Sequence, residues 1–206
     1  MSQVLARARP VGRLFAALPD ALTCIAYLWT WLQPLRFDSD AVKTLMLVML
    51  IEFLVVHSGG FLGVTVLSDG TSKLRKSFAL LGLGCFYLMF AAAFSLAFDA
   101  WWPVWTFLWL LGSRFALVWL SPIPRESEAD RQMALWGLSV AAYLGAVFAG
   151  VFLPLPELGI RHELLSSFGL TGGGLWVEKP QTVIASGAIY FAIMAVSKWK
   201  WGAPPV

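Results

Sequence analysis

The chain has 206 residues, of which 59% are hydrophobic and only 13% charged, and its formal net charge is +3. Soluble domains are about half apolar and about a quarter charged, so this composition excludes an ordinary soluble fold. The basic residues stand in short groups at the ends of apolar runs rather than on one face. This distribution argues against a nucleic-acid partner and indicates membrane topology.

Apolar runs near the length that crosses a hydrocarbon core recur along the chain, which predicts an all-α, polytopic transmembrane helical bundle. The basic and apolar N-terminus resembles a signal peptide. It lacks a small-x-small cleavage site, so we interpret it as a retained first span. We expect one integral membrane domain over residues 1–206, with six spans at about 14–35, 41–67, 77–98, 101–120, 132–154 and 182–199.

Lys and Arg are distributed unequally between the two sides of this drawing. Ten lie on the side that holds both termini, four lie on the other side, and Arg114 falls inside a span. Cytoplasmic loops are enriched in Lys and Arg, so both termini are predicted to be cytoplasmic (N-in, C-in). The expected location is the cytoplasmic or inner membrane, as for a small bacterial-type protein.

Ionisable side chains inside the spans are the candidate functional residues. Counting 1.5 Å per residue from the predicted outer edge, Glu52 lies roughly 16 Å deep and Arg114 roughly 20 Å deep. A charge near the bilayer centre costs about 2.5 to 3.5 kcal/mol on insertion scales and needs a partner or water. We therefore predict a Glu52–Arg114 ion pair at mid-membrane.

A second polar layer is expected nearer the cytoplasm. His57 and Asp20 fall at similar predicted depths and form a possible pair, although Asp20 after Pro19 could equally cap a helix start. Ser58, Gly59 and Gly60 follow His57 directly. They predict either a kinked or unwound helix that lines a transport site or a close crossing of two helices.

Small residues predict how the bundle packs. Ala141, Gly145 and Ala149 recur every four residues on the fifth span, beside Ala142, Ala146 and Gly150, and suit helix packing or self-association. The external loop, residues 155–181, contains apolar residues at helical spacing from Ile160 to Phe168. This spacing favours a short outward amphipathic helix on the membrane surface. Gly172, Gly173 and Gly174 then form a possible hinge, for a lid or for a passive connector.

These features favour a small channel- or transporter-like protein that binds or passes an ion, a proton or a small polar solute at a buried Glu/Arg/His site. The alternative is a non-catalytic membrane subunit or assembly partner whose buried charges form a structural clamp. An enzyme is less favoured because no hydrolase, phosphate-loop or cysteine-cluster motif is found. We expect no cofactor and no metal, because the only histidines, His57 and His162, fall on opposite sides of the drawing. The expected partners of the protein are the lipid bilayer and either a second copy of the chain or another membrane protein.

Overall fold

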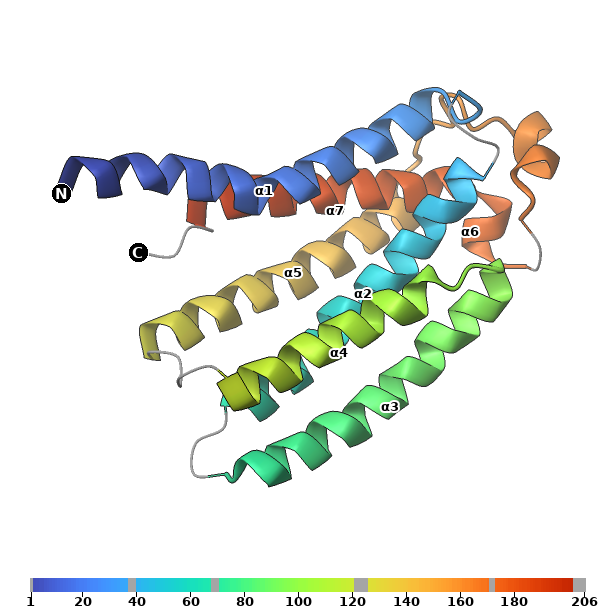
Figure 1. Cartoon of the computed structure of the whole chain (residues 1–206). Helices are drawn as coiled ribbons and strands as arrows, with labels where there is room; N and C mark the ends of the chain where they lie inside the picture. Colours follow the sequence, from blue (N-terminus) through green and yellow to red (C-terminus); the bar gives the residue numbers. More distant parts are fainter. Residues whose placement is uncertain (1, 37–39, 68–70, 121–125, 171–172, 202–206) are drawn as a thin grey trace. The chain divides into compact units, whose positions relative to one another are not determined.

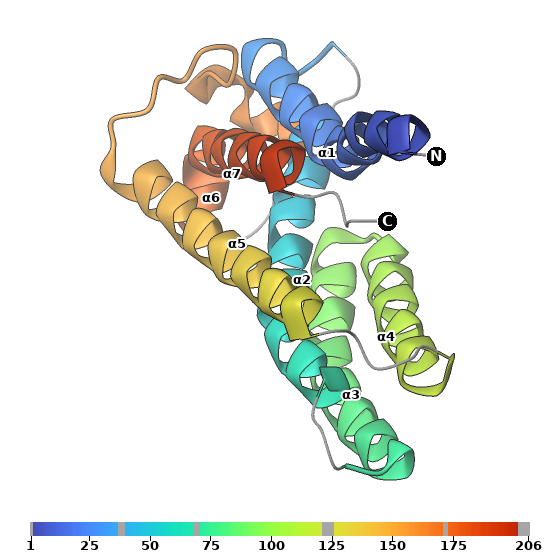
Figure 2. The same cartoon turned by 90° about the vertical axis from the view of Figure 1, so that its left-hand side faces the viewer.

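The computed structural model describes residues 2–36, 40–67, 71–120, 126–170 and 173–201, and every regular element in these ranges is a helix. The elements in chain order are α1 (Ser2–Leu32), α2 (Ala41–Leu67), α3 (Lys73–Phe98), α4 (Trp102–Leu120), α5 (Glu126–Phe152), the 3₁₀ helix η1 (His162–Phe168), α6 (Leu175–Glu178) and α7 (Pro180–Trp201). Figures 1 and 2 show the course of the chain.

Six of these helices are long and apolar enough to cross a membrane: Gly12–Leu32, Ala41–Val66, Lys73–Phe98, Trp102–Leu120, Met133–Phe152 and Pro180–Lys200. The all-helical, multi-pass prediction is therefore confirmed. The first helix ends at Leu32 rather than at residue 35, because Pro34 disfavours helical backbone in the residue before it. The last begins at Pro180, since a proline is tolerated in a first helical turn.

Local capping explains where several helices begin and end. Ser72 precedes α3 with extended backbone, and its side chain accepts a hydrogen bond from the Arg75 backbone N–H. At the other end of α3, Asp99 adopts a left-handed conformation with φ 51°, and the Ala100 N–H donates to the Ser95 carbonyl at 3.0 Å. The sharp turn into α4 follows from this left-handed residue.

The chain divides into two compact units. Unit 1 comprises residues 1–46 and 141–206, and unit 2 comprises residues 47–140. Unit 2 is one continuous stretch of chain, whereas unit 1 is built from the two ends of the sequence. Helices α2 and α5 each contribute residues to both units.

The centre of unit 1 is the pairing of α1 with α7, which lie side by side in both views (Figures 1 and 2). The two helices run antiparallel, since Asp20 contacts Lys198 and Cys24 contacts the carbonyl of Ala188. Tyr27 is fully buried between them, stacks on Phe191 at 5.6 Å between ring centroids, and donates its hydroxyl proton to the Leu45 carbonyl at 2.6 Å. One aromatic side chain thus joins α1, α2 and α7.

Gly187 makes this close approach possible. A Cβ atom placed on Gly187 would lie 2.5 Å from Cδ1 of the Tyr27 ring, which no real packing allows. Small residues at helix interfaces let backbones approach closely inside a membrane, where the hydrophobic effect does not drive helices together. The glycine is therefore part of the α1–α7 interface.

Unit 2 has two layers of apolar packing. The upper layer, near the start of α4, consists of Leu47, Ile51, Leu54, Tyr87, Ala91 and Phe107. The lower layer consists of Leu62, Leu80, Leu111 and Val118. Gly84 of α3 permits the contact with α4, because a Cβ atom there would lie 2.5 Å from the Leu111 side chain. These layers fix which segments of α2, α3 and α4 share a level.

Candidate functional site

Helix α2 carries the polar segment of the second span, from Glu52 to Gly60. The helix is continuous from Ala41 to Leu67, so Ser58, Gly59 and Gly60 do not unwind it, whereas a kink at these residues stays a prediction. A tryptophan side chain packs against Gly60, and the alternative, a close crossing of two helices, stays a prediction. A Cβ atom on Gly60 would lie 2.6 Å from Cε2 of Trp136 on α5.

The Trp136 indole is fixed on α2 by a hydrogen bond as well as by packing. Its Nε1 donates to the Val56 carbonyl at 2.8 Å. A helical carbonyl has a second lone pair, so it can accept this bond and still take part in the helix. Gly59 and Gly60 therefore leave space for the Trp136 side chain while α2 stays helical.

His57 is exposed on α2 and bonded to α3. Its Nδ1 lies 2.8 Å from the hydroxyl of Tyr87, a residue that is itself buried. The rings of Phe53 and Phe61 lie one turn before and after the imidazole, each with its centroid 5.5 Å away. Glu52 is half-buried on the same helix. The tyrosine partner of His57 was not expected from the sequence.

Arg114 lies on the buried stripe of α4, in helical register with Phe107, Leu111 and Val118. The residue is half-buried, and its Nε is enclosed without a hydrogen-bond partner in the described part of the chain. Because Leu111 and Val118 belong to the lower layer, Arg114 is level with Leu62 and Leu80, whereas Glu52 adjoins Ile51 of the upper layer. The Glu52–Arg114 pair stays a prediction.

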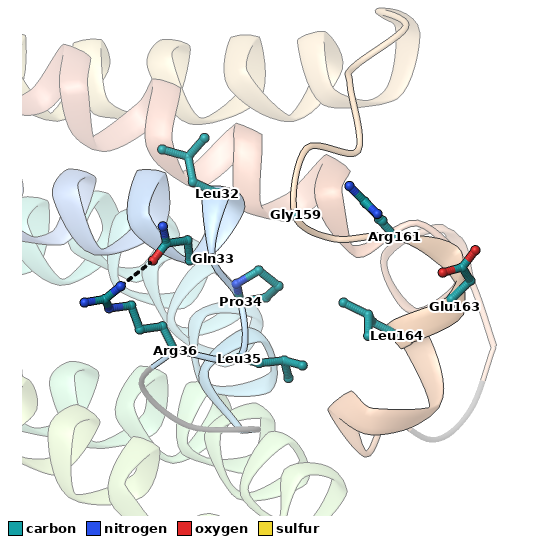
Figure 3. Close-up of a pocket in the computed structure, with 9 residues that line it drawn as sticks. All are labelled: Leu32, Gln33, Pro34, Leu35, Arg36, Gly159, Arg161, Glu163 and Leu164. Atoms are coloured by element: carbon teal, nitrogen blue, oxygen red, sulfur yellow. Dashed lines mark hydrogen bonds between the residues drawn. The ribbon is translucent and has the colours of Figure 1, made fainter.

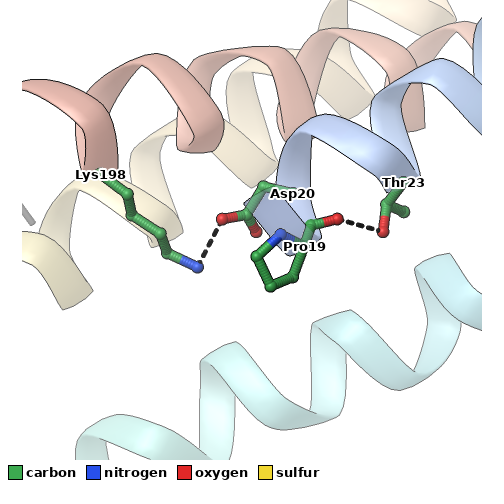
Figure 4. A network of polar contacts seen from close by, with 4 residues as sticks. All are labelled: Pro19, Asp20, Thr23 and Lys198. Atoms are coloured by element: carbon green, nitrogen blue, oxygen red, sulfur yellow. Dashed lines mark hydrogen bonds and ion pairs between the residues drawn. The ribbon is translucent and has the colours of Figure 1, made fainter. Parts of the chain in front are cut away.

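Asp20 has a partner that the sequence analysis missed. The Lys198 ammonium of α7 lies 2.7 Å from Asp20 Oδ2, and the two side chains are 35% and 10% exposed (Figure 4). Asp20 Oδ2 has no hydrogen bond of good geometry among the described residues, so this contact is a close ion pair. Helix α1 runs through Pro19 and Asp20, so the interpretation of Asp20 as a helix-start cap is wrong. Asp20 and His57 belong to different units, and their pairing stays a prediction.

The small residues of α5 pack on a face adjacent to the predicted one. Ala141 and Gly145 are exposed and Ala149 is half-buried, whereas Ala142, Ala146 and Gly150 are buried. The buried row meets α7, where the Ser186 hydroxyl lies 2.9 Å from the Ala146 carbonyl and 2.8 Å from the Thr182 carbonyl. Packing within the chain thus uses the row beside the predicted ridge, and self-association through Ala141, Gly145 and Ala149 stays a prediction.

The segment between α5 and α7 contains the 3₁₀ helix η1 where a short helix was expected, and the short helix α6, which was not expected. Ile160 and Phe168 are buried, and Leu164 and Leu165 are half-buried. Gly172 of the possible hinge lies outside the described residues. Gly174 has φ 114°, a conformation that only glycine adopts easily, and it precedes α6. The hinge and lid stay predictions.

Comparison with known proteins gives no assignment. No protein-family model, no curated protein and no solved structure matches the chain. Six apolar helices are consistent with a multi-pass membrane protein.

Proposed function

We propose that the protein binds or passes a small ion or polar solute inside unit 2, with Arg114 as the charged group of the site. The observation that carries this proposal is the Nε of Arg114, which is enclosed in a helix long and apolar enough to cross a membrane and has no hydrogen-bond partner among the described residues. Arginine has five N–H donors and no acceptor, and a buried donor without a partner costs about 1 to 3 kcal/mol. An anion or a carboxylate-bearing solute would supply the missing acceptor.

Other polar groups of unit 2 support a series of sites rather than a single clamp. Ser95 is fully buried on α3, and its hydroxyl has no partner among the described residues. Tyr87, which bonds His57, lies two helical turns, about 12 Å, from Ser95 along the same buried face. Arg114 lies one layer further on. Ionisable and polar groups aligned inside spans are typical of pathways for ions and protons.

The test is reconstitution into liposomes, followed by flux measurements for several ions at two pH values. We expect flux in the parent protein, a loss of at least about tenfold in Arg114→Gln, and partial retention in Arg114→Lys, which keeps the charge. Arg75→Gln is the matched control, because Arg75 is exposed at the start of α3 in the same unit. Absence of flux for every ion, with all variants folded, would overturn the proposal.

A second candidate is a non-catalytic subunit or assembly partner. The Asp20–Lys198 ion pair favours it, because there the buried charge joins two helices of the chain itself. Purification in mild detergent discriminates between the two functions. A stoichiometric protein partner together with no flux supports the subunit, whereas flux from the purified chain alone supports the transport site.

A further inference from the structure

Six aromatic rings on α2 and α3 form one continuous series of contacts in unit 2. We call them the aromatic surface, and they are Phe53, His57, Phe61, Phe86, Tyr87 and Phe90. The centroid of the His57 ring lies 5.5 Å from those of Phe53 and Phe61, and 5.8 Å from that of Tyr87. The four phenylalanines are exposed, whereas Tyr87 is buried. A planar aromatic ligand would find ring partners from two helices here.

His57 lies well inside a segment long and apolar enough to cross a membrane. Counting along α2, it is about 24 Å from Ala41 and about 14 Å from Val66, the two ends of that segment. The imidazole is nevertheless exposed at the surface of the chain. Acyl chains form no hydrogen bonds, so a ring nitrogen that faces them lacks a partner at a cost of about 1 to 3 kcal/mol. A ligand that hydrogen-bonds this nitrogen would remove that cost.

Tyr87 holds the imidazole by one of its two nitrogens. Nδ1 lies 2.8 Å from the Tyr87 hydroxyl, and no hydrogen bond of Nε2 is found among the described residues. The two nitrogens of an imidazole point in diverging directions, so Nε2 is directed away from the tyrosine. A neutral imidazole has one donor and one acceptor nitrogen. Nε2 is therefore a donor when Tyr87 donates to Nδ1, and an acceptor when Nδ1 donates to Tyr87.

These two hydrogen-bonding states narrow the class of ligand. The carbonyl oxygen of a quinone accepts from Nε2 in its donor state, and the hydroxyl of the corresponding quinol donates to Nε2 in its acceptor state. Both forms have a planar ring that can stack against exposed phenylalanines. With an alkyl tail, both forms dissolve in the bilayer and reach a group inside a span without entering water.

We infer that the aromatic surface binds the ring of a lipid-soluble quinone or quinol. His57 Nε2 is the group that bonds the ligand, and Tyr87 orients the imidazole through Nδ1. The site does not use Arg114, which carries the proposed transport function, and quinone binding is measured without flux. Failure of one therefore leaves the other unaffected.

The other histidine of the chain provides an internal comparison. His162 is exposed at the start of η1 in unit 1. Its neighbour Arg161 lines a hollow of about 350 Å³ (Figure 3). The Arg36 guanidinium there turns toward Gln33 and away from Arg161, so the two arginines do not face a common ligand. His162 is thus an exposed histidine outside the aromatic surface.

The experiment adds decylubiquinone to the full chain in nanodiscs, with the histidines isotope-labelled on their ring nitrogens. Decylbenzene, a ring with the same tail and no carbonyl group, is the comparison probe. We expect decylubiquinone to shift the NMR resonance of His57 Nε2 and to leave that of His162 unchanged. Decylbenzene should leave both resonances nearly unchanged, because it offers no hydrogen-bonding group.

Three variants separate the hydrogen bond from packing, with native mass spectrometry measuring the bound fraction of each probe. His57→Phe keeps an aromatic ring but removes the nitrogen, and should weaken decylubiquinone binding about tenfold. Tyr87→Phe removes the orienting hydroxyl and should weaken it about two- to fivefold, with a changed Nδ1 resonance of His57 in the free protein. His162→Phe is the matched control and should have little effect. Decylbenzene binding should be the same in all of them, which shows that each variant keeps its folded surface.

Equal binding of decylubiquinone and decylbenzene to the parent protein would overturn the inference, as would unchanged decylubiquinone binding in His57→Phe. A parent dimer that His57→Phe dissociates, with no effect of decylubiquinone on the Nε2 resonance, would also overturn it. That result would assign the aromatic surface to a second copy of the chain.

Discussion

Gly187→Ala tests the close packing of α1 on α7. The new Cβ atom would lie 2.5 Å from Tyr27 Cδ1, about 1 Å closer than ordinary van der Waals contact. The ring cannot move away freely, because its hydroxyl is bonded to Leu45 and its face is stacked on Phe191. Overpacking of this kind costs about 1 to 3 kcal/mol, partly offset by about 0.5 to 1 kcal/mol of improved helix propensity. We expect a net loss of about 1 to 2 kcal/mol.

The assay is unfolding in mixed micelles, titrated with a denaturing detergent and followed by circular dichroism. Gly145→Ala is the matched control in the same unit, since a Cβ atom there has nothing within 4 Å and should be neutral or slightly stabilising. In a Tyr27→Leu background the ring is gone, and Gly187→Ala should then cost little. If Gly187→Ala is as well tolerated as Gly145→Ala, or costs the same with and without the ring, the proposed close approach is wrong.

Three further changes test the polar contacts by the same unfolding assay. Lys198→Gln leaves the Asp20 carboxylate buried without its cation and should lower the free energy of unfolding by about 1 to 3 kcal/mol. The loss is smaller than for a fully buried pair because Lys198 is one-third exposed. Lys200→Gln, at an exposed lysine of the same helix turn, is the control, and equal effects of the two substitutions would refute the ion pair. Trp136→Phe keeps an aromatic ring but removes the hydrogen bond to the Val56 carbonyl, so we expect the free energy of unfolding to fall by about 0.5 to 1.5 kcal/mol. An unchanged free energy of unfolding would show that this hydrogen bond does not stabilise the protein. Ser186→Ala should cost about 0.6 kcal/mol, the average for such a bond inside a membrane, and an unchanged stability would contradict a link between α5 and α7 through this hydroxyl.

The sequence predicts the helices of this protein well because membrane spans depend on length and apolarity, both of which are local properties. All six expected spans occur in the structure, with differences of a few residues at their ends where proline and capping residues decide the boundary. Counting residues gives the position along one helix but not the level of that helix against its neighbour, since Arg114 is level with Leu62 whereas Glu52 adjoins Ile51 of the other layer. What counting cannot give is the rotation of a helix or the identity of its neighbours.

The partners of the polar residues depend on that missing information. Asp20 was matched with His57 by depth, but the pairing of the first helix with the last brings Lys198 to it. Gly60 was predicted to interrupt α2, but the side chain of Trp136, 76 residues later in the chain, occupies the space beside this glycine. An even number of spans does place the first and last helices antiparallel with their termini on one side. That signal could have drawn attention to Lys198.

The pairing of α1 with α7 also determines the order in which the protein can be completed during synthesis. Residues 47–140 form a continuous unit, so unit 2 has all of its helices once this stretch has left the ribosome. The first helix, by contrast, is made at the start, and its Tyr27 and Asp20 can contact Phe191 and Lys198 only after α7 has been made. Until then a charged aspartate is left in an apolar span without its lysine. Unit 1 is therefore the part of the molecule most dependent on complete translation, because a chain stopped before α7 would have all the helices of unit 2 but a first helix without its contacts to α7.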